Sequence, residues 1–187
     1  MLVAAAAIVL ASLGPAMLRH ETRPVAGRMD DGALVLRGDD LGHAEAAPET
    51  VSYVARNAAW QVTGLRVAVL PKLGPVQPQE TGLRILIDPE AALGLGEGPF
   101  RVDVEIAPVP VTTAPELALA LDRGGEPEWR TQPISVVDNV ISYEFPRADI
   151  GIVLHAVAIR PVATLEDYNY GVEIRSIRII PSSSAAS

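Results

Sequence analysis

Residues 100–106 read Phe-Arg-Val-Asp-Val-Glu-Ile, and this stretch decides the fold class. Its four apolar residues occupy every second position, and its three charged residues fill the positions between them. Successive side chains of a β-strand point to opposite faces, so this alternation predicts a strand with one face on a core and the other in water.

Working outward from this stretch, similar runs recur along the chain at short intervals. They predict strands at residues 65–70, 83–87, 117–121, 129–137, 140–145, 152–159 and 172–180. Clusters of Gly, Pro, Asp and Asn separate them, and no amphipathic helix long enough for a parallel crossover intervenes. We therefore expect an all-β domain built as an antiparallel two-sheet sandwich.

The last predicted strand contains a change of phase. Val172 and Ile174 share one face, whereas Ile177 and Ile179 have the opposite parity. An extra residue near 175–176 would return both pairs to the core face, so the pattern predicts a β-bulge there.

Residues 50–62 are ambiguous. Val51, Val54, Ala58 and Val62 recur at near-helical spacing, which allows a short helix, while Val51 and Tyr53 also alternate as in a strand. Residues 89–99 have the composition of a single helical turn followed by a glycine-rich turn.

Composition limits the classes of partner and chemistry. The 187 residues carry a net charge of −8, which disfavours nucleic acid as a partner because few phosphates could be neutralised. Cysteine is absent, which excludes disulfides and thiolate chemistry. Aromatic residues make up only 4%, so Val, Ile, Leu and Ala are expected to fill the core.

The N-terminal segment is apolar. Residues 1–18 carry no charged side chain, and as a helix they would span about 27 Å, close to the ~30 Å hydrocarbon core of a bilayer. We expect a retained transmembrane anchor, with a cleaved signal peptide as the alternative. The predicted organisation is an anchor at 1–18, a linker at 19–31, a β-sandwich domain at 32–181 and a disordered tail at 182–187.

The location of the domain is less constrained. Basic residues follow the apolar segment and none precedes it, which by the positive-inside rule would keep the body in the cytoplasm. The alternative, a start upstream of residue 1, permits export. We expect a single-pass protein of a bacterial inner membrane whose soluble domain lies in the periplasm.

The C-terminal half resembles the galactose-binding-like jelly rolls of carbohydrate-binding modules and envelope proteins. The resemblance rests on FRVDVEI at 100–106, ISYEF at 141–145 and GVEIRSIRII at 171–180. It implies a jelly-roll-like sandwich and transfers no specific ligand residue, because such folds bind sugars, lipids and proteins alike.

Motifs for catalysis, metals and cofactors are missing from the sequence. There is no Gly-x-Ser-x-Gly elbow, no His-Glu-x-x-His and no phosphate-binding loop. His155, within a predicted strand, is typical of a partly buried structural histidine. We expect no enzyme, no cofactor and no metal site.

The best candidate binding segment is the loop before the last strand. It contains Glu166, Asp167, Tyr168, Asn169 and Tyr170, which combine aromatic faces with carboxylate and amide groups. Sugar sites need both kinds of group, and loops carry binding more often than strands do. The alternative is that the tyrosines fix the loop to the edge of the sandwich.

Two tryptophans are further candidates. Trp129, with Trp60, would add a stacking platform to this loop, although packing at the rim of the core is the commoner role of such residues.

Two functions fit these features. The first is a structural accessory subunit of an inner-membrane complex, of a respiratory or photosynthetic type, that docks an exported sandwich on protein partners. Its Ala-rich anchor would pack against other helices. The alternative is a membrane-anchored carbohydrate-binding module that acts on an envelope glycan.

Overall fold

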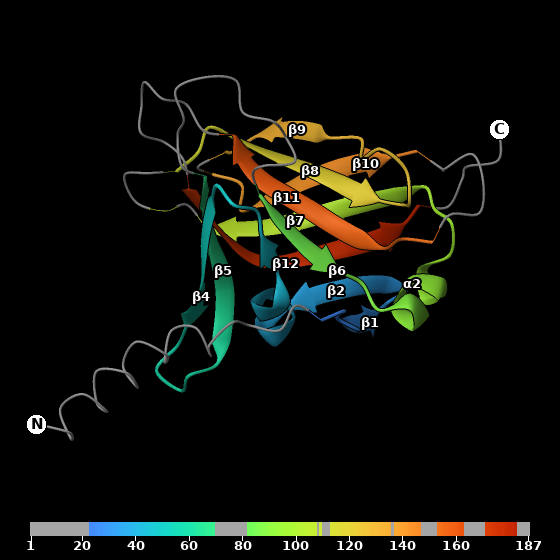
Figure 1. Cartoon of the computed structure of the whole chain (residues 1–187), viewed down its shortest axis with the longest axis horizontal. Helices are drawn as coiled ribbons and strands as arrows, with labels where there is room; N and C mark the ends of the chain where they lie inside the picture. The colour runs from blue at the N-terminus through green and yellow to red at the C-terminus, as the bar shows by residue number, and fades with distance from the viewer. Residues whose placement is uncertain are drawn as a thin grey trace, which may run out of the picture.

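The computed structural model describes residues 23–69, 82–107, 109, 113–135, 137–146, 153–162 and 171–182. Among these residues the strands form two sheets, of seven and five strands, and neighbouring strands pair antiparallel within each sheet. The sheets stack face to face (Figure 1), which confirms the predicted jelly-roll-like β-sandwich.

The larger sheet is organised around its longest strand, β12. One edge of β12 pairs along its length with β7, which in turn pairs with β10. The opposite edge is shared by β5 and β2, and these continue outward to β4 and β1. The strands of this sheet are β1 Arg28–Asp30, β2 Ala33–Arg37, β4 Thr50–Arg56, β5 Val62–Val69, β7 Phe100–Ala107, β10 Val140–Phe145 and β12 Gly171–Pro181.

The smaller sheet has the order β3-β6-β11-β8-β9. Its strands are β3 Glu45–Ala46, β6 Leu83–Leu86, β8 Glu116–Asp122, β9 Arg130–Pro133 and β11 Ala156–Val162. Two short helices connect strands, the 3-10 helix η1 Gly38–His43 and the α-helix α2 Pro89–Leu95. Asp88 caps α2 by accepting hydrogen bonds from the backbone N–H groups of Glu90 and Ala91.

The core lies between the sheets and is mainly aliphatic, as the composition predicts. The alternating residues of β7 are buried at each apolar position, from Phe100 to Ile106. Tyr143 on β10 is fully buried, and its hydroxyl donates to the carbonyl of Leu117 on β8 at 2.7 Å. This hydrogen bond joins the two sheets through the core.

The predicted bulge in the last strand is confirmed. The register between β12 and β7 shifts between Ile174 and Ser176, which leaves Arg175 as the extra residue. Val172 and Ile174 before the shift, and Ile177 after it, are all fully buried. One inserted residue therefore keeps both halves of β12 on the core face.

The short helix allowed at residues 50–62 is wrong. The segment forms β4 and begins β5, joined by a turn, and Thr50 to Arg56 pair antiparallel with residues 62–69. Long-range pairing with β5 outweighs the local helical spacing of the valines.

The sandwich also begins earlier than expected. Val25, within the predicted linker 19–31, is buried, and its N–H donates to the carbonyl of Leu86 at 2.9 Å. Strand β1, Arg28–Asp30, also lies within the predicted linker and pairs with β2 of the predicted sandwich. The polar composition of this segment reflects an exposed edge strand, because all three β1 side chains are exposed.

His155 differs from its predicted environment. It lies just before β11 and is exposed, while its backbone exchanges hydrogen bonds with Ile87 and Asp122. Leu154 takes the buried position instead.

The expected anchor at 1–18 and residues 183–187 of the expected tail lie outside the described residues. Within the described residues, no helix has the length and apolar character required to cross a bilayer.

Candidate functional site

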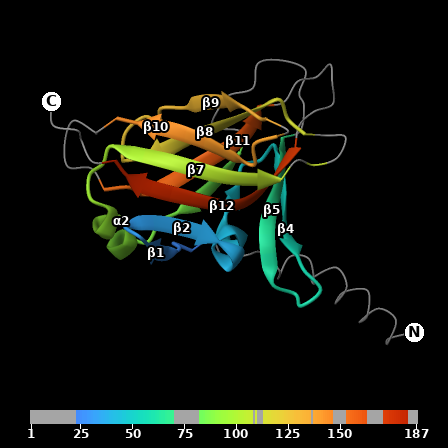
Figure 2. The same ribbon diagram turned by 180° about the vertical axis from the view of Figure 1, so that it is seen from behind.

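A hollow on the outer face of the larger sheet lies where β12 changes its neighbour. Residues 171–174 of β12 pair with β5, whereas residues 176–179 pair with β2. Because β5 and β2 diverge from the same edge of β12 (Figure 2), an opening with a volume of about 1070 Å³ remains between them. We call it the fork groove. Its walls are formed by residues of the hairpin 56–63 and of the segment 30–39, and its floor contains Glu105, Arg175, Ser176 and Arg178.

A tightly bonded turn shapes the hairpin wall. The side-chain oxygen of Asn57 accepts hydrogen bonds from the N–H groups of Ala59 and Gln61, at 2.9 and 3.1 Å. The N–H of Trp60 donates to the carbonyl of Asn57 at 3.0 Å, and Arg56 Nη1 donates to the carbonyl of Trp60 at 2.8 Å. These bonds fix the conformation of the turn that forms this wall.

Trp60 is the outstanding residue of this turn. Its backbone φ is +63°, a left-handed conformation that costs a residue with a Cβ roughly 1–2 kcal/mol. Its side chain is 79% exposed, although an indole is among the largest apolar groups a protein can bury. A strained backbone thus holds an uncovered aromatic ring at the wall of a groove.

The bulge in β12 builds the floor. The Oγ of Ser176 donates to Oε2 of Glu105 on β7 at 2.9 Å. Arg175, the inserted residue, points its guanidinium toward Glu173, with an Nε–Oε1 distance of 3.7 Å. The floor is therefore polar and is held by contacts across two strands.

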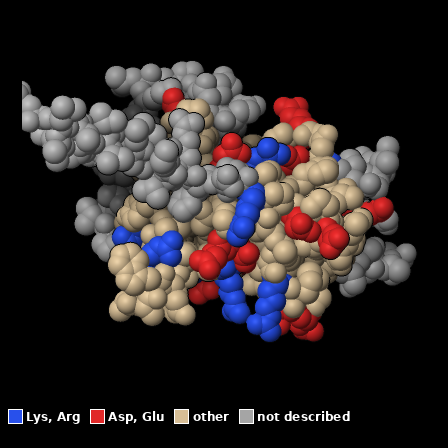
Figure 3. Space-filling model, turned by 60° about the horizontal axis from the view of Figure 1, so that its bottom comes forward, with Lys and Arg blue, Asp and Glu red and all other residues tan. Residues whose placement is uncertain are grey.

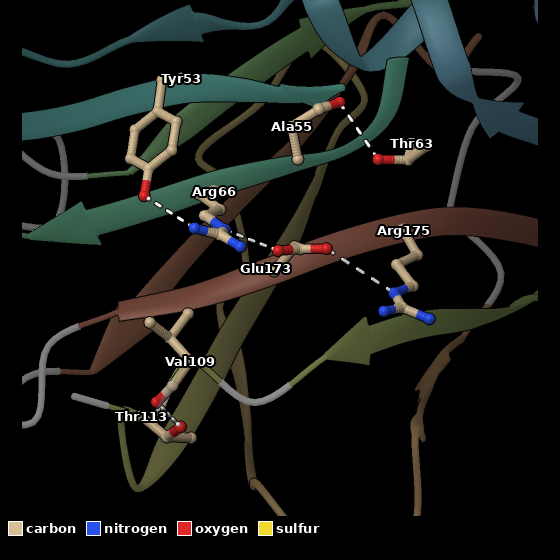
Figure 4. Close-up of polar contacts among 8 residues, drawn as sticks. All are labelled: Tyr53, Ala55, Thr63, Arg66, Val109, Thr113, Glu173 and Arg175. Atoms are coloured by element: carbon tan, nitrogen blue, oxygen red, sulfur yellow. Dashed lines mark hydrogen bonds and ion pairs between the residues drawn. The ribbon is translucent and has the colours of Figure 1, made fainter. Parts of the chain in front are cut away.

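A chain of polar contacts braces the hairpin against β12 (Figure 4). Arg66 on β5 lies between Tyr53 on β4 and Glu173 on β12, with an Nε–Oε2 distance of 2.6 Å to the carboxylate. The hydrogen bonds that Arg66 donates to Tyr53 and Glu173 raise the pKa of Arg66 above its ordinary value. Gly64 leaves room for Glu173, because a Cβ there would lie 3.3 Å from the Cγ of that side chain.

Charges of both signs line the groove. Four arginines, at positions 37, 56, 175 and 178, accompany three carboxylates, those of Asp30, Asp39 and Glu105. Arg178 lies 3.8 Å from Asp30, measured from Nη1 to Oδ2. Arginine and carboxylate side chains are also interspersed over the face that Figure 3 brings forward. The groove can therefore offer hydrogen-bond donors and acceptors together.

Of the residues predicted as a binding site, the structure describes Trp129 but not the loop. Glu166, Asp167, Tyr168, Asn169 and Tyr170 lie outside the described residues. Trp129 is partly buried, and the guanidinium of Arg160 lies 4.5 Å from its ring centroid. Trp129 and Trp60 do not share a platform, since they line separate hollows.

The hollow beside Trp129 is smaller, about 530 Å³, and lies on the five-stranded sheet. Its lining includes Pro127 and Ala158, and the ion pair of Arg84 with Asp122 lies at its side. Burial acts to raise the pKa of Asp122, but hydrogen bonds from the Gly124 N–H and Arg84 outweigh it, so the pKa is lowered. Arg160 covers one face of the indole, which leaves less aromatic surface for a ligand than Trp60 offers.

Among the described residues, no group of three or more His, Asp or Glu side chains is arranged to hold a metal ion. The residues of the fork groove do not stand out in the sequence because they come from six strands and two connecting segments. Asn57 to Gln61 between two strands was the one available local signal, because Asn is favoured in tight turns.

No family model and no curated protein matches this sequence. Among solved structures, the chain is similar to the CBM22-1 and GH10 modules of endo-1,4-beta-D-xylanase 10B from Clostridium thermocellum, complexed with xylohexaose. That match has a TM-score of 0.44 and 13% identity and covers 81% of this chain.

A second similar structure is the exo-beta-1,3-galactanase of Phanerochaete chrysosporium with galactose, with a TM-score of 0.33, 15% identity and 73% of this chain covered. The chain spans 28% of the length of each of these proteins.

Proposed function

We propose that this chain is a non-catalytic glycan-binding module and that the fork groove is its binding site. The observation that carries the proposal is Trp60, an indole 79% exposed on a left-handed backbone at the wall of a polar groove.

An exposed indole in this position suits a sugar ring. The apolar C–H face of a pyranose covers an aromatic ring, while its hydroxyl groups at the ring edge require hydrogen-bond partners. Trp60 offers the face, and Gln61, Thr63 and Ser176 offer amide and hydroxyl groups in the same groove.

The groove dimensions fit a short stretch of polysaccharide. A volume of about 1070 Å³ lies just above the range of about 300–1,000 Å³ for small-molecule sites. The groove is open to solvent along the fork, so a chain longer than the site can pass through it.

Intrinsic fluorescence tests this proposal directly, because Trp60 and Trp129 are the two tryptophans of the chain. In the Trp129→Phe variant, Trp60 alone reports on the fork groove, and in the Trp60→Phe variant Trp129 alone reports on the smaller hollow. We expect neutral and acidic oligosaccharides to change the emission of the first variant and to leave the second unchanged.

A Trp60→Ala variant should lose binding in affinity electrophoresis and keep its melting temperature, because the indole is 79% exposed and contributes little packing. A response confined to Trp129 would move the site to the other sheet. No response from either tryptophan across the oligosaccharide panel would refute glycan binding.

A second candidate, the accessory subunit of an inner-membrane complex, is favoured by strand β4. It lies at an end of the larger sheet, and its Val51 and Tyr53 are 48% and 55% exposed. An exposed apolar edge strand can accept a further strand from a protein partner. Val51→Lys should release partners that co-purify in stoichiometric amounts after mild detergent extraction, whereas a monomeric wild type would count against this function.

For both candidates we propose that residues 1–18 anchor the chain in a bacterial inner membrane with the sandwich in the periplasm. Resistance of the full chain to alkaline extraction, combined with digestion of the sandwich by protease added to spheroplasts, would support this location. Full release by alkali, or protection from the protease, would contradict it.

A further inference from the structure

We infer that the fork groove selects glycans that carry carboxylate groups, that is, uronic acid units; the inference rests on the proposed glycan-binding function. The starting observation is an imbalance of charge. The chain carries −8 overall, yet the groove is lined by four arginines and three carboxylates. The groove is thus a locally cationic site on an anionic protein.

Two of the four arginines are engaged on the floor. Arg178 lies 3.8 Å from Asp30, and Arg175 lies 3.7 Å from the buried carboxylate of Glu173. Glu105 accepts a hydrogen bond from Ser176, so this carboxylate is engaged as well. These contacts hold the floor in place and do not depend on a ligand.

The other two arginines are available. Within the described part of the chain, neither Arg37 nor Arg56 forms an ion pair. Arg56 uses Nη1 to donate to the carbonyl of Trp60 and so keeps most of its five N–H donors for a ligand. Arg37 is exposed at the end of β2.

Arg37 and Arg56 stand on opposite walls where these walls approach each other. A Cβ on Gly38, the neighbour of Arg37, would lie 3.6 Å from the carbonyl oxygen of Val62. Val62 is the ladder partner of Arg56, one strand spacing of about 4.8 Å away. Two arginine side chains can therefore reach toward one ligand between the walls.

The guanidinium group decides the ligand class. Its planar fork of donors matches a carboxylate with two parallel hydrogen bonds, a geometry that a neutral hydroxyl cannot supply. Trp60 is held by the same turn as Arg56, and its indole would cover the face of the sugar ring that carries this carboxylate. Long-range attraction does not favour a polyanion on a chain of net charge −8, so selectivity has to come from these short-range contacts.

The test uses ligands matched in everything except the carboxylate. Tetramers of galacturonate and of mannuronate are compared with their carboxyl-reduced forms, by isothermal titration calorimetry on the full chain in detergent. We expect the wild type to bind one of the uronate tetramers at least tenfold more tightly than its reduced form. In Arg37→Gln/Arg56→Gln the ratio between the two affinities should fall to about one.

Arg101→Gln is the matched control, because it removes one arginine from the same sheet at a place where it pairs with Asp103 outside the groove. The control should keep the tenfold preference.

Each other outcome has a definite meaning. Equal binding of the charged and reduced tetramers, or a sulfated tetramer bound as tightly as the uronate, would overturn the carboxylate inference and leave glycan binding intact. A preference that survives in the double variant would also overturn it. Absence of binding to every tetramer, charged or neutral, would instead refute the proposed function itself.

Discussion

Replacing Tyr143 with Phe should remove the hydrogen bond that joins the two sheets through the core. Tyr143 is fully buried, and its hydroxyl donates to the carbonyl of Leu117 at 2.7 Å. Leu117 pairs with Pro161 on β11 and with Gln132 on β9. The variant therefore removes the donor that reaches this carbonyl from the core.

The magnitude follows from that arrangement. Phe keeps the ring, so no cavity opens, and the loss is limited to the hydrogen bond, about 0.5–1.5 kcal/mol. Urea unfolding followed by circular dichroism should show a lower midpoint with an unchanged slope. Tyr53→Phe is the control, because its hydroxyl is on an exposed residue and accepts a longer, 3.3 Å hydrogen bond; its effect should stay within about 0.5 kcal/mol.

The same pair of proteins gives a test in alkali. Burial raises the pKa of Tyr143, so the folded state holds the phenol proton more tightly than the unfolded state does. The corresponding stability is fully present below the ordinary phenol pKa of about 10 and is lost as pH rises through the raised value. Wild type should therefore lose its advantage over Tyr143→Phe above about pH 10. Equal midpoints at neutral pH would refute the role of this hydrogen bond.

Two further predictions concern stability. Gly64→Ala should cost about 1–3 kcal/mol in urea unfolding, because the new Cβ would lie 2.9 Å from the carbonyl oxygen of Ile174. Gly94→Ala, with open space around it in a helix, should be neutral or stabilise by up to about 1 kcal/mol, and a comparable loss in both would disprove the steric explanation. The lowered pKa of Asp122 implies that its contribution to stability is present above about pH 4 and falls away in acid. Asp122→Asn should flatten the decline in melting temperature between about pH 5 and 2, and an unchanged decline would contradict this assignment.

The sandwich could be predicted because its signals are local. The period of two from Phe100 to Ile106 reports directly on a half-buried strand, and the change of phase around Arg175 locates a bulge without any knowledge of its neighbours. The short helix at residues 50–62 was a wrong prediction because the spacing of the valines fits both the helical and the strand period. Pairing with β5, a long-range contact that no local pattern records, decides between them.

The fork groove could not be predicted in the same way. Arg37, Arg56 and Arg178 are scattered over 142 positions of sequence and meet only because β12 exchanges β5 for β2 along one edge. The sequence indicates Trp60 only as a companion to Trp129, since the exposure of its side chain depends on a left-handed turn that composition does not reveal. The predicted loop at residues 166–170 stays a prediction.

Because the floor of the fork groove lies on β12, the binding site forms late in the synthesis and folding of the chain. Both walls, residues 30–39 and 56–63, are synthesised more than 100 residues before residues 175–178. At that earlier stage both wall segments of the nascent chain lack the strand with which they pair, so the binding site does not exist. Long-range strand pairs also form slowly compared with local hairpins. Ligand binding can therefore report that folding is complete. A chain that ends before Gly171 lacks β12, the strand with which both walls pair.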